Sequence, residues 1–246
     1  MLESLFDPGT IRHLEAVGVR PGWRCLELGG GGGSIAAWLA RRVAPGGAVV
    51  ATDLDVTFLE ELAEPNLEVH RHDVEAADPP AGPFDLVHMR FLLAWLRDPQ
   101  AVLRRIAAAL KPGGVLLAEE MDFVSVVPDP RVDPEAAALL ARVQEAKTTA
   151  VATVHGLDPL HGRRLAADLA AAGLAGVASE GRCATWRGGT PGARFEALSV
   201  LQLREAAVAT GLVSDADVDR ALALYENPGF SFVSPITMAA WGRRPS

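Results

Sequence analysis

The sequence predicts an α/β protein with a doubly wound parallel sheet and helices on both of its faces. Three observations support this class. Strand-like and helix-like segments alternate through the first 120 residues, a run of five glycines joins the first strand to a helix, and acidic residues follow the ends of two strands. Alternation of this kind is typical of a parallel sheet whose faces are covered by helices.

The elements of the first half follow from apolar periodicity and from the turn residues between them. After a helix over 10–17, strands are expected over 24–28, 49–52, 67–71, 84–88 and 115–119. Helices are expected between them at 35–43, 56–62 and 100–110. Proline and glycine at 45–47 and 112–114 end two of these helices and turn the chain into the next strand.

The second half lacks this alternation and is predicted to be mainly helical, because alanine is the best helix former. Helices are expected over 133–154, 158–173, 194–210 and 215–225, with strands over 177–186 and 230–241. We expect one domain over 1–246, a cofactor-binding core over 20–125, and added helices at 130–157 and 191–227 that form a substrate cap.

Composition and charge narrow the classes of partner. The chain has 23 Lys and Arg against 31 Asp and Glu, a net charge of −8, and its arginines are scattered. Nucleic acid is therefore not an expected partner. The sequence has no apolar run long enough for a membrane span, and the residues at its start lead us to expect no secretory signal. Its two cysteines, Cys25 and Cys183, are far apart in sequence, so a cytoplasmic location is expected.

The turn after the first strand carries the main chemical signal. Glu27 and Leu28 lead directly into Gly29–Gly33, and glycines let a ligand approach the backbone near a helix N-terminus. The dinucleotide pattern G-x-G-x-x-G fits only if its third position is relaxed to Ala36. Glu27 argues further against a pyrophosphate, because its carboxylate would repel that group and attract an ammonium or sulfonium.

Two further acids follow strand ends at the same predicted edge of the sheet. Asp53 ends the second strand about 20 residues after Gly33, where a carboxylate can accept hydrogen bonds from ribose hydroxyls. Asp73 ends the third strand, where it can accept from an exocyclic amine such as that of adenine. Either acid could instead cap the turn that follows it. The pattern predicts a nucleoside ligand.

Five short motifs follow one another through about residues 20–120: Leu26–Gly33, Val50–Asp53, His72–Val74, Phe84–His88 and Leu110–Gly114. In this order and spacing they resemble those of the class I S-adenosylmethionine-dependent methyltransferases. The resemblance implies a Rossmann-like seven-stranded sheet whose last strand runs antiparallel. A narrower likeness, shared by the ending 239–245, is to bacterial small-molecule enzymes of quinone and natural-product pathways.

The same resemblance implies which residues bind the cofactor S-adenosyl-L-methionine. It assigns the methionine amino end to Glu27 and Gly29 with Gly31 in the same loop, the ribose to Asp53, the adenine face to Leu54, the adenine edge to Asp73 and Val74, and the methionine part to the backbone of Met89. Magnesium-dependent relatives carry an aspartate after the fourth strand. This chain has His88-Met89-Arg90 there, so no metal is expected.

Methyl transfer from a sulfonium is an in-line displacement from a donor that is already activated. The main task of the protein is to hold the nucleophile about 3 to 3.5 Å from the methyl carbon, and a base is optional. The candidate catalytic residues are His155 as a general base and Glu120 as a group that orients an amine or takes a proton. Other candidates at the acceptor side are His88, Arg90, Leu93, Glu119, Met121, Asp122, Phe123 and His161.

Three functions remain in competition at this stage. The leading hypothesis is metal-independent methyl transfer to an oxygen, nitrogen or carbon nucleophile of a small organic acceptor. The second is an NAD-dependent oxidoreductase, which rests on Asp53 and the glycines. The third is a protein that binds S-adenosylmethionine without transferring its methyl group. The sequence leaves the acceptor, the oligomeric state and any lid motion open.

Overall fold

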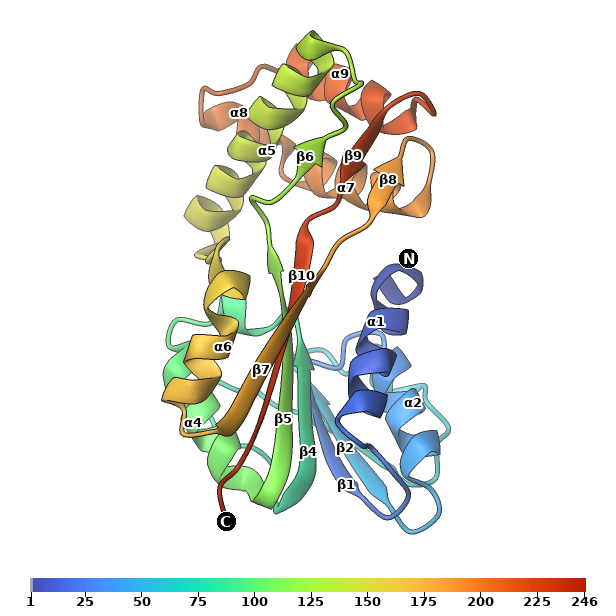
Figure 1. Cartoon of the computed structure of the whole chain (residues 1–246), viewed down its shortest axis with the longest axis vertical. Coiled ribbons are helices and arrows are strands. Elements are labelled where there is room, and N and C mark those ends of the chain that lie inside the picture. The colour runs from blue at the N-terminus through green and yellow to red at the C-terminus, as the bar shows by residue number, and fades with distance from the viewer. Residues whose placement is uncertain (1) are drawn as a thin grey trace. The chain divides into compact units, whose positions relative to one another are not determined.

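The computed structural model describes residues 2–246, which form two compact units. The sheet unit comprises Phe6–Glu120, Gly162–Glu180 and Met238–Ser246. The helical unit comprises residues 2–5, Met121–His161 and Gly181–Thr237. Each unit therefore gathers segments that are far apart in the sequence, as the colours of Figure 1 show.

The sheet unit contains a seven-stranded sheet in the order β3-β2-β1-β4-β5-β10-β7. The strands are β1 (Arg24–Leu28), β2 (Ala48–Asp53), β3 (Leu67–Arg71), β4 (Phe84–Arg90), β5 (Leu110–Asp122), β7 (Ala175–Arg182) and β10 (Ile236–Arg243). The first five pair in parallel, whereas β10 runs in the opposite direction to β5 and β7 (Figure 1). The predicted Rossmann-like sheet with its last strand antiparallel is confirmed.

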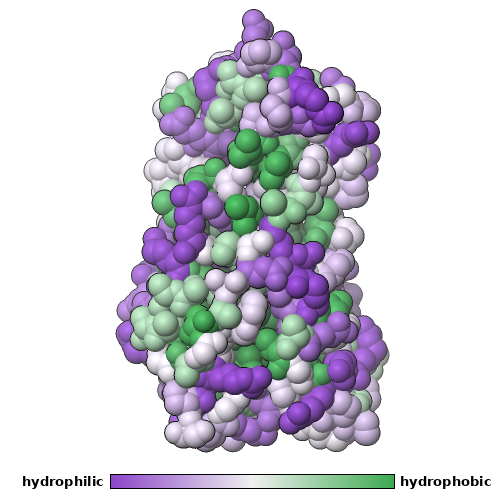
Figure 2. All heavy atoms as spheres, viewed as in Figure 1, coloured by the Kyte–Doolittle hydropathy of each residue, from purple (hydrophilic) through white to green (hydrophobic). Residues whose placement is uncertain are grey.

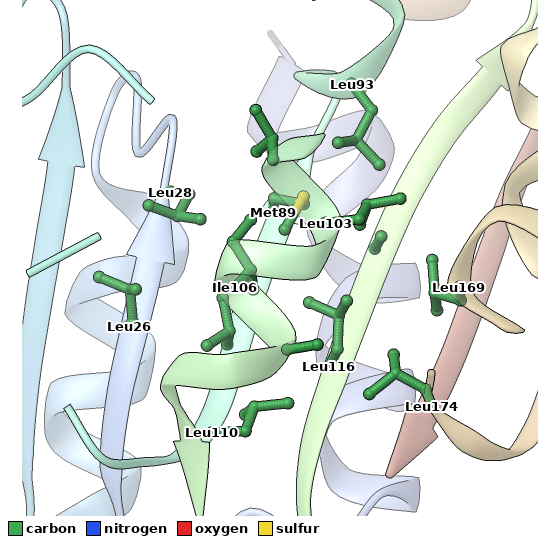
Figure 3. Close-up of a cluster of buried hydrophobic side chains, with 14 of the residues drawn as sticks. Leu26, Leu28, Met89, Leu93, Leu103, Ile106, Leu110, Leu116, Leu169 and Leu174 are labelled. Atoms are coloured by element: carbon green, nitrogen blue, oxygen red, sulfur yellow. The ribbon is translucent and has the colours of Figure 1, made fainter. Parts of the chain in front are cut away.

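Helices cover both faces of this sheet. On one face α1 (Leu2–Ala16) and α2 (Ser34–Val43) pack against a core cluster that includes Cys25 and Leu86. On the other face α4 (Pro99–Ala109) and α6 (His161–Ala171) pack against Leu26, Leu28 and Met89 (Figure 3). Successive strand residues point to opposite faces, so β1 supplies Cys25 to one core and Leu26 to the other. The short helices α3 (Thr57–Glu60) and η1 (Leu93–Trp95) follow the ends of β2 and β4.

The helical unit contains four helices and a small antiparallel sheet among its described residues. The helices are α5 (Pro134–His155), α7 (Pro191–Gln202), α8 (Arg204–Ala209) and α9 (Asp215–Glu226), and the strands pair in the order β6 (Val127–Pro128), β9 (Ser231–Val233), β8 (Thr185–Arg187). Its core includes Val143, Val200, Tyr225 and Phe232. Asp133 caps α5 by accepting from the backbone N–H of Glu135, with Pro134 at the first helical position.

Several element boundaries differ from the prediction. The first helix begins at Leu2 and not at residue 10, and β5 extends back through the predicted turn to Leu110. The predicted helix over 194–210 is interrupted at Leu203. The two strands predicted over 177–186 and 230–241 were wrong as single strands, because each divides between the large and the small sheet.

The break between β7 and β8 and the break between β9 and β10 are hydrogen-bonded to each other inside the helical unit. The backbone N–H of Ser234 donates to the Ala184 carbonyl at 2.8 Å, and the Ala184 N–H donates to the Ser234 hydroxyl oxygen at 3.1 Å. These bonds satisfy backbone groups that leave the strand ladders at both breaks.

The described surface is mixed in character. Figure 2 shows hydrophilic and apolar residues interspersed over the visible face, as is usual for a folded protein, because apolar atoms make up much of any protein surface. Among the described residues, none of the helices is both long enough and apolar enough to span a bilayer.

Candidate functional site

A cavity of about 430 Å³ lies in the sheet unit where β1, β2, β3 and β4 end. The carboxyl ends of parallel strands are where doubly wound sheets bind ligands, and the volume is in the range of small-molecule sites. The cavity is lined by Gly29, Thr52, Asp53, Leu54, His72, Asp73, Val74, Glu75, Arg90, Phe91, Leu92, Trp95 and Leu96. Five of the eight residues expected to bind the cofactor are in this lining: Gly29, Asp53, Leu54, Asp73 and Val74.

The glycine loop turns from β1 into α2 through left-handed backbone conformations. Gly29, Gly31 and Gly33 have φ angles of 68°, 51° and 82°, which glycine adopts without the steric cost of a side chain. At Gly33 a Cβ atom would also lie only 2.7 Å from Leu62 Cδ1. The N–H of Gly30 donates to the Thr52 carbonyl at 3.0 Å and so ties the loop to the end of β2. The loop leaves bare backbone beside the cavity.

Asp53 and Asp73 line the cavity and also stabilise the turns around them. Asp53 Oδ2 accepts from the Gly31 N–H at 2.8 Å, and Asp53 Oδ1 accepts from the Asp55 N–H at 3.2 Å. Asp73 Oδ1 accepts from the Glu75 N–H at 2.9 Å. A carboxylate oxygen has more than one lone pair, so turn capping and ligand binding are compatible at both positions. Gly31 thus contributes by orienting Asp53, and it is not in the lining.

Apolar side chains form one wall of the cavity. Leu54 is 61% exposed and Trp95 is 46% exposed, although both are large and apolar. Leu92 and Phe91 extend this wall after the end of β4. Exposed apolar surface beside a cavity is typical of a ligand site, because a flat apolar ligand would remove it from water.

The remaining two expected residues lie outside the lining. The Met89 side chain is fully buried in the core beneath α4 (Figure 3). Glu27 is 3% exposed, and its Oε2 is 2.7 Å from His88 Nδ1. Glu27 alternates with Leu26 and Leu28, so it faces the α1 side of the sheet and not the Met89 side.

Glu27 belongs to a buried ionic network at the ends of β1, β4 and β5. His88 Nε2 lies 3.5 Å from Glu119 Oε2, which is an ion-pair distance. Burial alone would lower the pKa of His88, but the charges of Glu27 and Glu119 and their hydrogen bonds raise it to about 9. Burial would raise the pKa of Glu119, yet hydrogen bonds from His13, His88 and Thr10 hold it well below its usual range.

The helix α1 completes this network and links it to Arg90, which lines the cavity. His13 Nδ1 is 2.9 Å from Glu119 Oε1, and the Thr10 hydroxyl donates to Glu119 Oε2. Arg90 donates to the Thr10 hydroxyl oxygen at 2.8 Å and to Asp7 Oδ1 at 2.9 Å. The side chains of α1 therefore hold both a cavity residue and the buried carboxylate of β5.

Glu120, one of the two expected catalytic residues, lies on the opposite face of β5 from Glu119. It is 1% exposed, and its Oε1 accepts from the backbone N–H of Leu93 at 2.5 Å and of Ala94 at 3.4 Å. Burial raises the pKa of Glu120 to about 8 even though these backbone hydrogen bonds act to lower it. The carboxyl group thus fixes η1, the segment that carries Trp95 into the cavity wall.

The other acceptor-side candidates belong to the helical unit. His155, the expected general base, ends α5, and its side chain is outside the described part of the structure. His161 is 1% exposed, with its Nδ1 4.0 Å from Asp158 Oδ2. Asp122 is buried, and its Oδ1 accepts from the Val124 N–H at 3.2 Å. Neither Asp122 nor His161 is in the lining of the cavity in the sheet unit.

Several lining residues were not singled out by sequence reasoning, namely Thr52, His72, Glu75, Phe91, Leu92 and Leu96. Each lies within a few positions of a strand end, so the position itself was the available signal. The sequence around Phe91 carries no signal that would predict its backbone conformation. Phe91 adopts a left-handed φ of 58° and packs edge-on against Phe6, with ring centroids 5.0 Å apart.

The fold and this cavity define an α/β protein with a candidate small-molecule site at the carboxyl ends of its parallel strands. A family model described as a methyltransferase domain matches residues 6–179. The chain belongs to this methyltransferase domain family. Among curated relatives, a ubiquinone/menaquinone biosynthesis C-methyltransferase of Vibrio vulnificus is 33% identical over an alignment of 125 residues, and the alignment covers 48% of this chain and 47% of the relative. The chain spans about half the length of the curated relatives it matches.

Solved structures share the fold at low sequence identity. The YcgJ protein of Bacillus subtilis has a TM-score of 0.61 at 17% identity, covering 98% of this chain and 99% of its own. Phosphoethanolamine N-methyltransferase 2 of Haemonchus contortus, in complex with phosphomonomethylethanolamine and S-adenosylhomocysteine, has a TM-score of 0.60 at 17% identity and covers 97% of this chain and 53% of its own. At this identity the similarity establishes the fold.

Proposed function

We propose that this protein is an S-adenosyl-L-methionine-dependent methyltransferase that acts on a small organic acceptor by in-line displacement, without a metal ion. The observation that carries the proposal is the convergence of Gly29, Asp53, Leu54, Asp73 and Val74 on one cavity in a chain of the methyltransferase domain family. Two carboxylates that can accept hydrogen bonds suit the hydroxyls and the exocyclic amine of an adenosyl group, and the bare backbone and the apolar wall suit its flat base.

The lining residues that were expected to bind the cofactor each have a role in this proposal. The Asp53 carboxylate accepts hydrogen bonds from both ribose hydroxyls, and Leu54 covers a face of the adenine ring. Asp73 accepts from the exocyclic amine, and the Val74 backbone meets the adenine edge. When bound, S-adenosyl-L-methionine supplies a methyl group already activated by its sulfonium. The chain itself holds that group in place and keeps water away from it.

The methionine end lies toward β1 and β4 in the same proposal. Gly29 lines the cavity and offers its backbone there, while the backbone of Met89 lies in the neighbouring strand. Glu27 supplies negative charge next to the glycine loop, which would attract the ammonium group and the sulfonium.

The acceptor side remains a prediction. We propose His155 as a general base, Glu120 in proton transfer, the helices at 130–157 and 191–227 as a substrate cap, and a cytoplasmic location. The curated relatives methylate carbon in quinone biosynthesis, and the solved neighbour binds a phosphorylated ethanolamine. We propose a quinone-like or other flat small molecule as the acceptor class, since the relatives in sequence are quinone enzymes.

Neither competing function is favoured. An NAD-dependent oxidoreductase would place a pyrophosphate beside the glycine loop, where the Glu27 carboxylate would repel it. A binding protein without activity would retain the cavity and give no methylated product.

Calorimetric titration with S-adenosylhomocysteine and with NAD tests the proposal. We expect binding of the first and no heat from the second. Asp53→Ala should weaken S-adenosylhomocysteine binding by about 1 to 3 kcal/mol, because charge-assisted hydrogen bonds to the ribose are lost. Asp55→Asn is the matched control, since Asp55 is an exposed neighbouring acid outside the cavity lining. NAD binding alone, or equal affinity in a folded Asp53→Ala variant, would contradict the proposal.

Turnover separates the enzyme from the binding protein. The wild-type chain is incubated with S-adenosylmethionine and panels of quinols, phenols, amines and carboxylic acids, and the products are identified by mass spectrometry. A methylated product from one panel identifies the acceptor class. Cofactor binding with no product from any panel would favour the non-catalytic function.

A further inference from the structure

The network that contains Glu27 has an unusual arrangement of charge. His88 is fully buried, and both of its ring nitrogens face carboxylates: Nδ1 lies 2.7 Å from Glu27 Oε2 and Nε2 lies 3.5 Å from Glu119 Oε2. Glu27 and Glu119 are themselves 3% and 2% exposed. A carboxylate can only accept hydrogen bonds, so a ring with carboxylates on both sides is best satisfied as the doubly protonated imidazolium.

A second imidazole, that of His13, also borders Glu119. Arg12 Nη2 is 3.1 Å from His13 Nε2, and arginine can only donate. His13 Nδ1 lies 2.9 Å from Glu119 Oε1, and His13 Nε2 also lies 3.9 Å from Glu180 Oε2. The triad of Glu27, His88 and Glu119 thus places two carboxylates around one imidazole.

The hydrogen bonds within the triad are unevenly shared. Glu119 Oε1 is hydrogen-bonded to His13 and Oε2 to Thr10, and Oε2 is also at an ion-pair distance of 3.5 Å from His88 Nε2. Glu27 has one oxygen hydrogen-bonded to His88, and its Oε1 has no hydrogen-bond partner among the described residues. Glu27 is also the member of the triad that stands next to the glycine loop, because a Cβ on Gly30 would lie 3.7 Å from Glu27 Cγ.

We propose that His88 is a positioning residue, which orients the Glu27 carboxylate toward the ammonium group of S-adenosyl-L-methionine. Glu119, which is itself fixed by α1, holds His88 in place. The inference rests on the proposed function and deepens it at the same site. His88 does not touch the ligand. It sets the rotamer of Glu27 through the Nδ1 hydrogen bond, and its positive charge makes burial of two neighbouring carboxylates possible.

A purely structural role for His88 makes a different prediction about ligands. If His88 only stabilised the fold, its loss would weaken binding of every ligand of the cavity to the same degree. If it acts through Glu27, its loss weakens only those ligands that carry the amino-acid end. S-adenosylhomocysteine and 5′-methylthioadenosine share the nucleoside and the sulfur, and only the first has the ammonium group.

The test is a calorimetric titration of both ligands into the wild type, His88→Leu, His88→Gln and Glu27→Gln. His88→Leu and Glu27→Gln should each weaken S-adenosylhomocysteine about ten-fold or more, as expected for loss of a hydrogen bond with a charged partner, and should change 5′-methylthioadenosine affinity by less than about two-fold. His88→Gln should restore part of the loss, because its amide can donate to Glu27. His70→Gln, an exposed histidine on β3, is the matched control.

The double variant Glu27→Gln with His88→Leu decides whether the two residues act together. We expect it to bind S-adenosylhomocysteine no more weakly than Glu27→Gln alone, because His88 has no route to the ligand other than Glu27. Additive losses, or equal losses for both ligands, would overturn the positioning role while leaving the proposed function intact. A wild type that binds neither ligand would overturn the proposed function itself. If His88→Leu does not fold, the same ligand comparison is made on His88→Gln and Glu27→Gln.

Discussion

Replacing Glu120 by glutamine should remove a large part of the pH dependence of stability. Glu120 is 1% exposed, and its carboxyl group accepts two backbone hydrogen bonds from η1. Burial raises its pKa from 4.5 to about 8. A glutamine side chain has nearly the same shape and keeps an oxygen that can accept from the same N–H groups, but it cannot ionise.

The size and sign of the effect follow from this pKa. The native state binds the proton of Glu120 more tightly than the unfolded chain, so its contribution is fully present below about pH 4.5 and is lost as the pH rises through about 8. One pKa unit corresponds to about 1.36 kcal/mol, so the complete titration removes roughly 5 kcal/mol from the free energy of unfolding. The slope should approach about 1.4 kcal/mol per pH unit within this window.

Urea unfolding of the wild type and Glu120→Gln between pH 5 and pH 9 measures this difference. The free energy of unfolding of the variant should exceed that of the wild type by an amount that grows with pH. Other titrating groups, including His88, are common to both proteins and cancel in the difference. Glu61→Gln, at an exposed position after α3, is the control and should follow the wild type. A difference between Glu120→Gln and the wild type that stays constant over this range would refute the reasoning.

Two further predictions concern stability, one at a glycine of the loop and one at a buried ion pair. Gly33→Ala should lower the free energy of unfolding by more than the roughly 1 to 2 kcal/mol that a left-handed backbone alone costs, because the new Cβ would also meet Leu62. Gly18→Ala is the control and should cost only the backbone part, since Gly18 has a φ of 95° and open space around it. Equal losses of unfolding free energy in urea would contradict this. Lys147→Met should destabilise by about 3 to 5 kcal/mol, because Glu196 is left buried without its cation. The double variant with Glu196→Leu should recover most of that loss in the same assay, and no recovery would count against the ion pair as the cause.

Much of the sheet unit could be predicted because its signals are local. Strands over 24–28 and 67–71 have the predicted bounds, since short apolar runs lie between turn residues. The spacing of Asp53 and Asp73 after two strand ends places them at the same edge of the sheet, and both line the cavity. Parallel pairing makes this inference safe, because the carboxyl ends of neighbouring parallel strands coincide.

The divided strands were missed because alternation has the same period on both sides of a break. Nothing in residues 177–186 distinguishes the part that joins the large sheet from the part that joins the small one. The break at Ala184 is held by Ser234 from the other divided strand. Pro235 was a signal for the second break, since proline lacks the N–H that a strand ladder requires. Long-range pairing of two breaks has no local signature.

The buried ionic network is a second feature that could not be predicted from the sequence. Glu119 and Glu120 are adjacent and chemically the same, and the sequence gives no reason to treat them differently. Strand geometry directs them to opposite faces, where Glu119 meets His13 and His88 and Glu120 meets backbone N–H groups of η1. The pKa of the first falls and that of the second rises. Ionisation of Glu120 as the pH rises through about 8 would therefore lower activity by destabilising the fold. A further group that must stay protonated for activity can be inferred from a loss above about pH 8 only if that loss persists in Glu120→Gln.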